Sequence, residues 1–213
     1  MIRVERFVNQ LIPSNCYLLV DDESGFCLCI DPASEKSEQE IAFISELKLT
    51  LDYVFITHEH TDHTWGVNAL VEKYPSAKVI CSETCRQNLK KKTNQAYFRY
   101  FYDDPNYNYS VSKVDLTTDA MDWKMNWHKH KVVYIPTPGH SMGSVCLCVE
   151  GLLFTGDAIL QSKPFINKRN GNRELFYDSV RKIIEMYNGN TIVDPGHGDP
   201  FLLKSLNFNI SKI

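Results

Sequence analysis

The stretch Leu51-Asp52-Tyr53-Val54-Phe55-Ile56-Thr57-His58-Glu59-His60-Thr61-Asp62-His63 decides the fold. Its first six residues are mostly apolar and rich in β-formers, which predicts a buried strand over Leu51–Ile56. Four metal-binding side chains follow within six residues. In extended chain His58 and His60 lie two residues apart and can aim at one point. Asp62 and His63 follow a turn and would aim at a neighbouring point, so the cluster predicts two adjacent metals.

The cluster is expected outside a helix interior, because His, Asp and Thr are poor helix formers. Three more ligand-type side chains follow predicted strands. His140 comes after Thr137-Pro138-Gly139, Asp157 after Thr155-Gly156 and His197 after Asp194-Pro195-Gly196. Glycine permits the sharp turns that bring such side chains over the edge of a sheet. Four strand ends with this pattern predict one shared site.

The remaining pattern predicts one α/β domain over residues 1–213. Short β-type segments lie at Ile2–Val8, Cys16–Asp21, Phe26–Ile30, Lys78–Cys81, Lys131–Ile135, Ser144–Val149, Leu152–Phe154 and Thr191–Val193. Helical patterns lie at Ser34–Leu47, Gly66–Lys73, Glu83–Lys92 and Glu174–Tyr187, followed by a short helical tail. Glu150-Gly151 is expected to form a hairpin turn. Residues 94–131 are the least regular and the richest in aromatic side chains.

Composition is that of an ordinary globular protein, with 43% hydrophobic and 23% charged residues. A net charge of -3 gives no general attraction to nucleic acid or anionic lipid, so neither is expected as a partner. The N-terminus shows no secretory signal, and no run approaches the roughly 18 apolar residues of a membrane span. We therefore expect a cytoplasmic protein. Its seven cysteines are expected to be reduced, with the alternating pairs Cys27/Cys29 and Cys146/Cys148 buried in strands.

The motif His58-x-His60-x-Asp62-His63, followed by His140, Asp157 and His197, resembles the metallo-β-lactamase superfamily. The resemblance is closest to its glyoxalase II-like (hydroxyacylglutathione hydrolase-like) branch. It covers nearly the whole chain and includes Asn15-Cys16-Tyr17-Leu18, Cys29-Ile30-Asp31-Pro32, Thr137–Ser144 and Pro195–Gly198. This resemblance implies a four-layer αββα sandwich.

The resemblance also implies a ligand set for two divalent metal ions. His58, His60 and His140 would bind one ion, Asp62, His63 and His197 would bind the second, and Asp157 would bridge them. Zn²⁺ is the default with imidazole and carboxylate ligands, and relatives also tolerate Fe or Mn. Two cations about 3.5–4 Å apart can lower the pKa of a shared water and supply hydroxide at neutral pH. Asp62 is the candidate for orienting that nucleophile and accepting a proton.

Glyoxalase II-like proteins hydrolyse thioesters, so a thioester or related ester is the expected substrate. Two departures leave recognition of glutathione open. The chain ends sixteen residues after His197, without the extra helical region of the glutathione-binding enzymes, and Gln161–Arg169 replaces their Gly-Arg-x-Asp segment. Lys163, Lys168 and Arg169 could instead bind an anionic substrate, or could lie in a solvated loop. The aromatic segment 97–109 could line the cleft or pack as an ordinary connection.

Other functions fit the same ligands. An iron-dependent persulfide dioxygenase would use one iron held by two His and one Asp. A further alternative is another hydrolase of the superfamily that cleaves esters, lactones or phosphodiesters. The last alternative is a metal-binding protein without catalytic activity. His128 and His130 alternate with lysines and are expected to be exposed rather than ligands. The oligomeric state is left open by the sequence.

Overall fold

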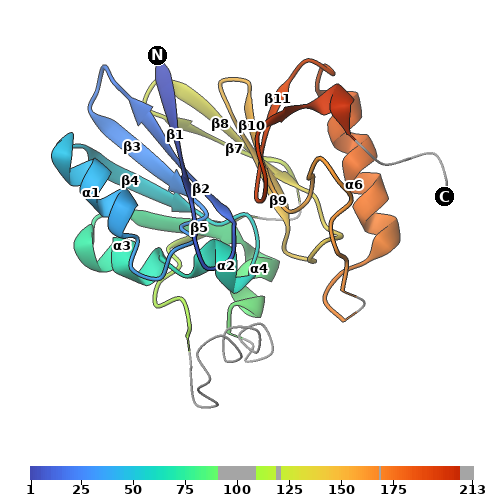
Figure 1. Ribbon diagram of the computed structural model, residues 1–213, viewed down its shortest axis with the longest axis horizontal. Helices are drawn as coiled ribbons and strands as arrows, with labels where there is room; N and C mark the ends of the chain where they lie inside the picture. The colour runs from blue at the N-terminus through green and yellow to red at the C-terminus, as the bar shows by residue number, and fades with distance from the viewer. Residues whose placement is uncertain (91–108, 119–120, 168, 207–213) are drawn as a thin grey trace.

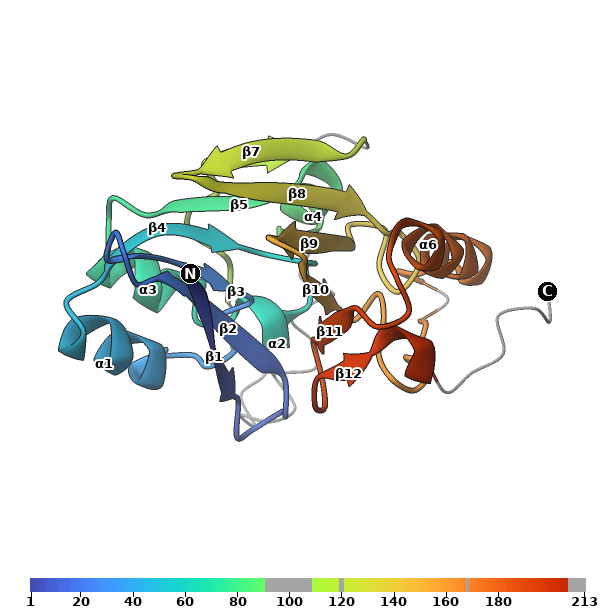
Figure 2. The ribbon, with the colours of Figure 1, turned by 90° about the horizontal axis from the view of Figure 1, so that it is seen from above.

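The computed structural model describes residues 1–90, 109–118, 121–167 and 169–206 of the chain. Two six-stranded sheets lie face to face, with helices on their outer faces (Figures 1 and 2). The predicted αββα sandwich is confirmed. Among the helices described, none is long and apolar enough to cross a membrane.

The first sheet has the order β1-β2-β3-β4-β5-β6. Its strands are β1 (Ile2–Val8), β2 (Asn15–Asp21), β3 (Phe26–Ile30), β4 (Thr50–Phe55), β5 (Lys78–Ser82) and β6 (Leu116–Thr118). β1, β2 and β3 pair antiparallel, whereas the pairs from β3 to β6 are parallel. Parallel pairing requires crossover connections, which bring the ends of β3 and β4 to the same edge of the sheet.

The second sheet has the order β12-β11-β10-β9-β8-β7. Its strands are β7 (Trp123–Trp127), β8 (His130–Pro136), β9 (Val145–Val149), β10 (Leu152–Gly156), β11 (Ile192–Pro195) and β12 (Phe201–Leu202). β7 to β10 are antiparallel, β10 and β11 are parallel, and β11 and β12 are antiparallel. Glu150 and Gly151 both have positive φ, as the predicted two-residue hairpin turn requires.

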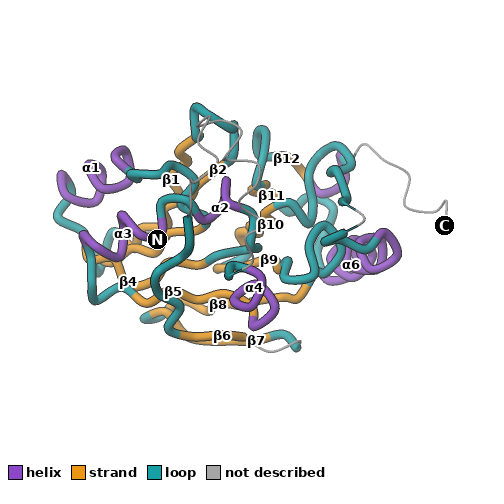
Figure 3. Tube along the Cα trace, turned by 90° about the horizontal axis from the view of Figure 1, so that it is seen from below, coloured by secondary structure: helices purple, strands orange, loops and turns teal. Residues whose placement is uncertain are grey.

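Helices follow several strands of the two sheets (Figure 3). They are α1 (Glu38–Glu46), α2 (Thr61–Thr64), α3 (Val67–Lys73), α4 (Glu83–Asn88), α6 (Arg173–Met186) and the 3₁₀ helix η2 (Leu203–Ser205). α1 and α3 lie against the first sheet and α6 against the second (Figure 2).

β2 shows how the layers are held together. All seven of its residues are buried, and successive side chains enter different cores. Leu18 and Val20 pack in the core beneath α1 and α3, while Tyr17 and Leu19 pack between the two sheets. A strand covered on both faces reads as a continuous apolar run rather than an alternating one. Because β2 is buried on both faces, its first residue, Asn15, lies against the loop after β11, where its N–H donates to the Gly196 carbonyl at 2.7 Å.

Several sequence expectations differ in detail from the structure. β6, β7 and β12 were not predicted, because they are short or alternate with exposed polar residues such as Lys124 and Asn126. The helix expected over Ser34–Leu47 starts only at Glu38, and the helical tail is the short η2. All seven cysteines are buried and free, which confirms that they are not paired in disulfides.

Candidate metal centre

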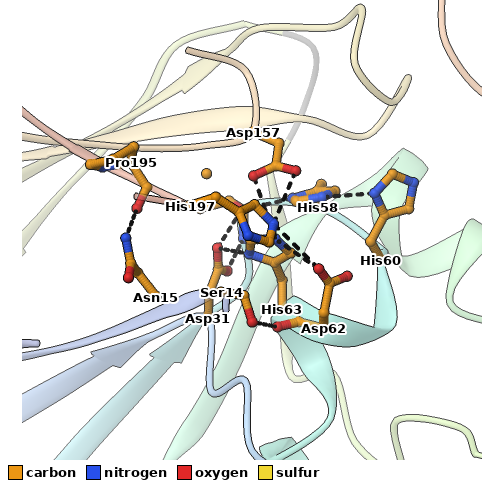
Figure 4. Close-up of polar contacts among 12 residues, drawn as sticks. Ser14, Asn15, Asp31, His58, His60, Asp62, His63, Asp157, Pro195 and His197 are labelled. Carbon is orange, nitrogen blue, oxygen red and sulfur yellow. Dashed lines mark hydrogen bonds and ion pairs between the residues drawn. The ribbon is translucent and has the colours of Figure 1, made fainter. Parts of the chain in front are cut away.

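The seven predicted ligands come together at one end of the sandwich, which we call the metal end. Figure 4 shows all of them except His140 with labels. Each follows a strand, as the sequence predicts. The first four lie after β4, and the others lie after β8, β10 and β11: His58, His60, Asp62, His63, His140, Asp157 and His197.

One expectation for the cluster was wrong. Asp62 and His63 lie inside α2, a single turn of helix that starts after His60. The His63 N–H donates to the His60 carbonyl at 3.1 Å, and the Thr64 hydroxyl donates to the same oxygen at 3.2 Å. A one-turn helix fixed by such local bonds depends little on helix propensity. Because of this helical turn, the side chains of Asp62 and His63 point toward His197, whereas those of His58 and His60 point toward His140.

His58, His60 and His140 form the first group of ligand atoms. His60 Nδ1 lies 3.0 Å from His58 Nε2 and 3.0 Å from His140 Nε2. All three ligand atoms lie within 4.8 Å of one another. Imidazole nitrogens at this spacing can bind one cation.

Asp62, His63 and His197 form the second group, which meets the same 4.8 Å criterion. The Nε2 atoms of His63 and His197 lie 3.3 Å apart. Asp62 Oδ2 lies 3.3 Å from His197 Nε2 and 3.7 Å from His63 Nε2. The group mixes two nitrogens with one carboxylate oxygen.

Asp157 lies between the two groups (Figure 4). Its Oδ2 is 3.5 Å from His140 Nε2 in the first group and 3.5 Å from His197 Nε2 in the second. Its Oδ1 is 3.5 Å from His63 Nε2, yet has no hydrogen-bond partner within the described parts of the chain although it is buried. A buried carboxylate oxygen without such a partner is costly unless a cation satisfies it.

Acceptors behind the rings fix which nitrogen carries the proton. His140 Nδ1 donates to the Phe165 carbonyl at 3.0 Å, and His197 Nδ1 donates to the Pro13 carbonyl at 2.7 Å. A carbonyl oxygen can only accept, so in the neutral form of each ring, which is the form that binds a metal, Nε2 carries the lone pair. Such outer acceptors are typical of metal-binding histidines.

Asp31 fixes the other two rings in the same way. Its Oδ2 accepts from His63 Nδ1 at 3.0 Å and from the Thr57 hydroxyl at 2.6 Å. Because Thr57 Oγ1 gives its hydrogen to Asp31, it accepts from His58 Nδ1 at 3.0 Å. One buried carboxylate therefore turns the Nε2 lone pairs of His58 and His63 toward the centre. Asp31, His58 and His63 also lie close enough to form a ligand set, but these contacts place Asp31 behind the rings.

Sequence reasoning missed this role of Asp31, although a signal was present. Asp31 directly follows β3, the parallel neighbour of β4, so it obeys the same strand-end rule as the predicted ligands. It also missed Glu59, whose buried carboxylate accepts from Ser141 Oγ at 2.8 Å and Asn88 Nδ2 at 2.7 Å. Glu59 ties the loop after β4 to the turn that carries His140.

The start of β2 holds the loop that carries His197. Asn15 Nδ2 donates to the carbonyls of Pro195 and Gly198, at 2.9 and 2.7 Å. Tyr17 Oη donates to the Pro195 carbonyl at 2.7 Å. These bonds join the two sheets at the metal end and position His197 (Figure 4).

The electrostatics of the centre favour a cation. Burial lowers the pKa of His58 and, to about 4, that of His140, which keeps both rings neutral. Burial acts in the same direction on His63, but Asp157, Asp62 and Asp31 outweigh it and raise the pKa of His63 to about 9. The carboxylates likewise raise the pKa of His197 to about 11 against the effect of burial. The second group thus lies in a strongly negative potential.

These observations meet the requirements of divalent metal ions. Nitrogen lone pairs converge in two neighbouring groups, carboxylates supply negative charge, and a buried Asp157 oxygen lacks a hydrogen-bond partner among the described residues. Zinc and iron both accept imidazole and carboxylate ligands.

Other candidate residues lie elsewhere. His128 and His130 are outside the centre, and His130 is only 6% exposed, so the expectation of exposure was wrong for it. It packs against Trp127 at a ring separation of 5.6 Å. Most of the aromatic segment 97–109, and also Lys168, lie outside the described residues. Tyr109 is described, and its hydroxyl donates to the Thr64 carbonyl beside α2.

Comparisons with known proteins agree with this fold. The uncharacterized protein ML0493 of Mycobacterium leprae is 26% identical over 202 residues, covering 89% of this chain and 88% of that protein. The crystal structure of the B3 metallo-beta-lactamase BLEG-1 has a TM-score of 0.81 at 24% identity and covers 95% of each chain. ETHE1 from Myxococcus xanthus has a TM-score of 0.73 at 24% identity, covering 96% of this chain and 80% of its own.

TTHA1623, solved in a di-iron-bound form, has a TM-score of 0.75 at 20% identity and covers 94% of this chain and 96% of its own. These structural likenesses show the fold. A family model described as the metallo-beta-lactamase superfamily matches residues 10–189, which is most of the sequence. The chain therefore belongs to the metallo-β-lactamase superfamily.

Proposed function

We propose that this protein is a binuclear metal-dependent hydrolase of thioesters or related esters. The observation that carries the proposal is the pair of neighbouring ligand groups with Asp157 between them. His58, His60 and His140 would hold one ion, and Asp62, His63 and His197 the other, with Asp157 contacting both. Zn²⁺ is the expected metal, while the di-iron-bound relative supports iron as a second candidate.

When bound, two such cations would lower the pKa of a shared water and polarise the carbonyl oxygen of the substrate. The chain itself would orient the reactants. Asp62 suits the role of proton acceptor because its side chain is 19% exposed and reaches solvent beside His197. Burial would raise the pKa of Asp62, but His63 and His197 lower it, so the carboxylate stays ionised at neutral pH. A thiolate leaves readily, so the chain needs no strong acid for thioesters.

A second function has its own support. His58 and His140 belong to the first group, and Asp157 lies 3.5 Å from His140. These three could supply two histidines and one carboxylate, which is the ligand set of many mononuclear iron oxygenases. Under this alternative the protein would be a persulfide dioxygenase that consumes oxygen. The likeness in fold to ETHE1 from Myxococcus xanthus is compatible with it.

The test combines metal content with two assays. Purified protein is analysed for metal per chain, then assayed for hydrolysis of an acyl thioester and for oxygen uptake with a persulfide. We expect two metals per chain and thioester hydrolysis. Asp62→Ala should lose at least about 100-fold in kcat, while Asp178→Ala, an exposed change on α6, should keep full activity. Oxygen uptake without hydrolysis would overturn the proposal.

A further inference from the structure

Glu59 is a buried acid in the chain segment that carries the first group of ligands. It lies between His58 and His60 in the chain, and only 2% of its surface is exposed. Ser141 Oγ donates to its Oε2 at 2.8 Å, and Asn88 Nδ2 donates to its Oε1 at 2.7 Å. A buried carboxyl group is costly unless donors of this kind compensate it. Each oxygen of Glu59 thus has one donor, and the two donors lie on different segments of the chain.

The contact with Ser141 organises the turn that carries His140. Ser141 directly follows His140, and its hydroxyl has a single hydrogen, which it gives to Glu59. The same hydroxyl oxygen accepts from the Gly143 N–H and from the Ser144 hydroxyl, both at 3.1 Å. Ser144 Oγ in turn accepts from the Ser141 N–H at 3.1 Å. The carboxyl group of Glu59 therefore sets the direction of the hydroxyl on which the bonds of this turn depend.

The helix α4 contacts the same turn. Ser82 Oγ, at the start of α4, donates to the Gly143 carbonyl at 2.8 Å. A Cβ at Gly143 would lie 2.7 Å from Glu59 Oε2 and 2.8 Å from Cys85 Cα, so only glycine fits between Glu59 and α4. Asn88, the last residue of α4, is the second donor to Glu59. Glu59 is thus joined to α4 both directly and through the turn.

The first group of ligands needs such support because its members come from both sheets. His58 and His60 follow β4 of the first sheet, whereas His140 follows β8 of the second. The distance of 3.0 Å between His60 Nδ1 and His140 Nε2 therefore depends on how the two loops lie against each other. The bond from Ser141 to Glu59 joins these two loops within one residue of the ligands.

The second group of ligands has other supports. Asp31 lies behind His63, and the Pro13 carbonyl lies behind His197. Within the described ranges, no hydrogen bond joins the side chain of Glu59 to a ligand of this group. Loss of the contacts of Glu59 should therefore affect the two groups unequally.

We infer that Glu59 is a positioning residue for the first metal ion. By holding the turn of His140 against the loop of His58 and His60, it sets the metal affinity of the first group and leaves that of the second group unchanged. Contacts behind metal ligands typically change metal affinity about 10- to 100-fold. The inference rests on the proposed function, because it concerns one of the two metal positions which that function requires.

The test measures the two groups separately. His197→Ala disables the second group and reports Zn²⁺ binding to the first, while His140→Ala disables the first group and reports binding to the second. Glu59→Gln is introduced into both backgrounds, because glutamine keeps the length of the side chain but faces one of the two donors with its own NH₂ group. Glu40→Gln is the matched control, since Glu40 on α1 is also a glutamate that is 2% exposed. Zn²⁺ affinity is measured by competition with a chelator, and folding by circular dichroism.

In the His197→Ala background, Glu59→Gln should weaken Zn²⁺ binding about 10- to 100-fold. In the His140→Ala background it should change the affinity by less than about 2-fold, and Glu40→Gln should have only this small effect in both backgrounds. Equal losses in the two backgrounds, which a general structural role would produce, would overturn the inference. The absence of a loss in the first group, or a similar loss in the control, would overturn it as well.

Ser141→Ala tests the path from Glu59 to His140 and replaces Glu59→Gln if that variant does not fold. It removes the hydroxyl that Glu59 orients, so it should weaken Zn²⁺ binding to the first group alone. The double variant should lose no more than the larger of the two single losses, because both changes remove the same contact. Losses that add would overturn the inference. If the wild type hydrolyses no thioester, the proposed function fails, while the two affinities still decide the role of Glu59.

Discussion

The two ends of the β-sandwich contain all seven histidines and use them differently. At the metal end four rings turn Nδ1 outward to an acceptor, and their Nε2 atoms converge with His60 and two carboxylates, Asp62 and Asp157. At the far end, where β2 finishes and β8 begins, each histidine faces a carboxylate of its own. His128 Nε2 lies 2.8 Å from Asp52, and His130 Nε2 lies 3.4 Å from Asp21.

The arrangement of the histidines distinguishes a metal site from His–Asp contacts that hold two sheets together. Carboxylates also lie next to the histidines of the far end. There, however, each histidine contacts a carboxylate separately, and each such contact joins the first sheet to the second sheet. Asp52 also accepts from Trp127 Nε1 at 2.9 Å. Several unprotonated nitrogens that converge on one point, rather than nearness of His to Asp, therefore indicate a metal centre.

The largest predicted effect tests this contrast directly. His58→Ala removes a ligand and should reduce thioester hydrolysis by more than about 100-fold, beyond the range expected for residues behind the ligands. Metal per chain, measured by elemental analysis, should fall with it. His128→Ala at the far end should keep both values within about 2-fold. Equal losses in the two variants would show that the two ends do not differ in function.

Asp31→Asn should have the next largest effect. Asn tolerates the φ of 51° at this position, so the backbone can be kept. The carboxylate uses both oxygens: Oδ2 accepts from the Thr57 hydroxyl and His63 Nδ1, and Oδ1 accepts from the Thr57 N–H. An amide has one oxygen only, so its NH₂ group would face one of these donors. We expect metal affinity to fall about 10- to 100-fold in a chelator competition titration. Asp22→Asn, an exposed change that affects only the pair with Arg3, is the control and should bind metal normally.

Sequence reasoning found the metal end because each ligand there follows a strand whose apolar pattern is strong. β4 and β8 each contain one exposed residue and β10 contains none, so hydrophobicity indicates both the strand and the point at which it ends. The conformation of α2 was missed because four residues are too few for helix propensity to be informative.

The far end was harder to predict for a different reason. His130 is buried by contacts with Trp127 and Asp21, which lie on β7 and β2 and come together only when the two sheets pack. In the sequence, His128 and His130 alternate with lysines, which suggests that both are exposed. This local pattern contains no information on how the two sheets pack around His130. Asp31 could have been predicted by the strand-end rule, but which side of the rings it occupies depends on the pairing of β3 with β4.

Asp21→Asn should change stability alone and so has the smallest effect on function. Burial raises the pKa of Asp21, but Ser24 and the Glu23 N–H outweigh it and lower the pKa below its ordinary value of 3.8. The folded protein therefore binds this proton less readily than the unfolded chain, and the carboxylate stabilises the fold above pH 3.8. We expect Asp21→Asn to lose about 1–2 kcal/mol of unfolding free energy at pH 7, measured by urea denaturation. The loss should shrink as the pH falls through the lowered pKa, because the wild type then also carries a neutral side chain.

Metal content and kcat of Asp21→Asn at pH 7 should match the wild type, since Asp21 lies at the opposite end of β2 from Asn15. A loss of metal in this variant would show that the far end supports the centre after all.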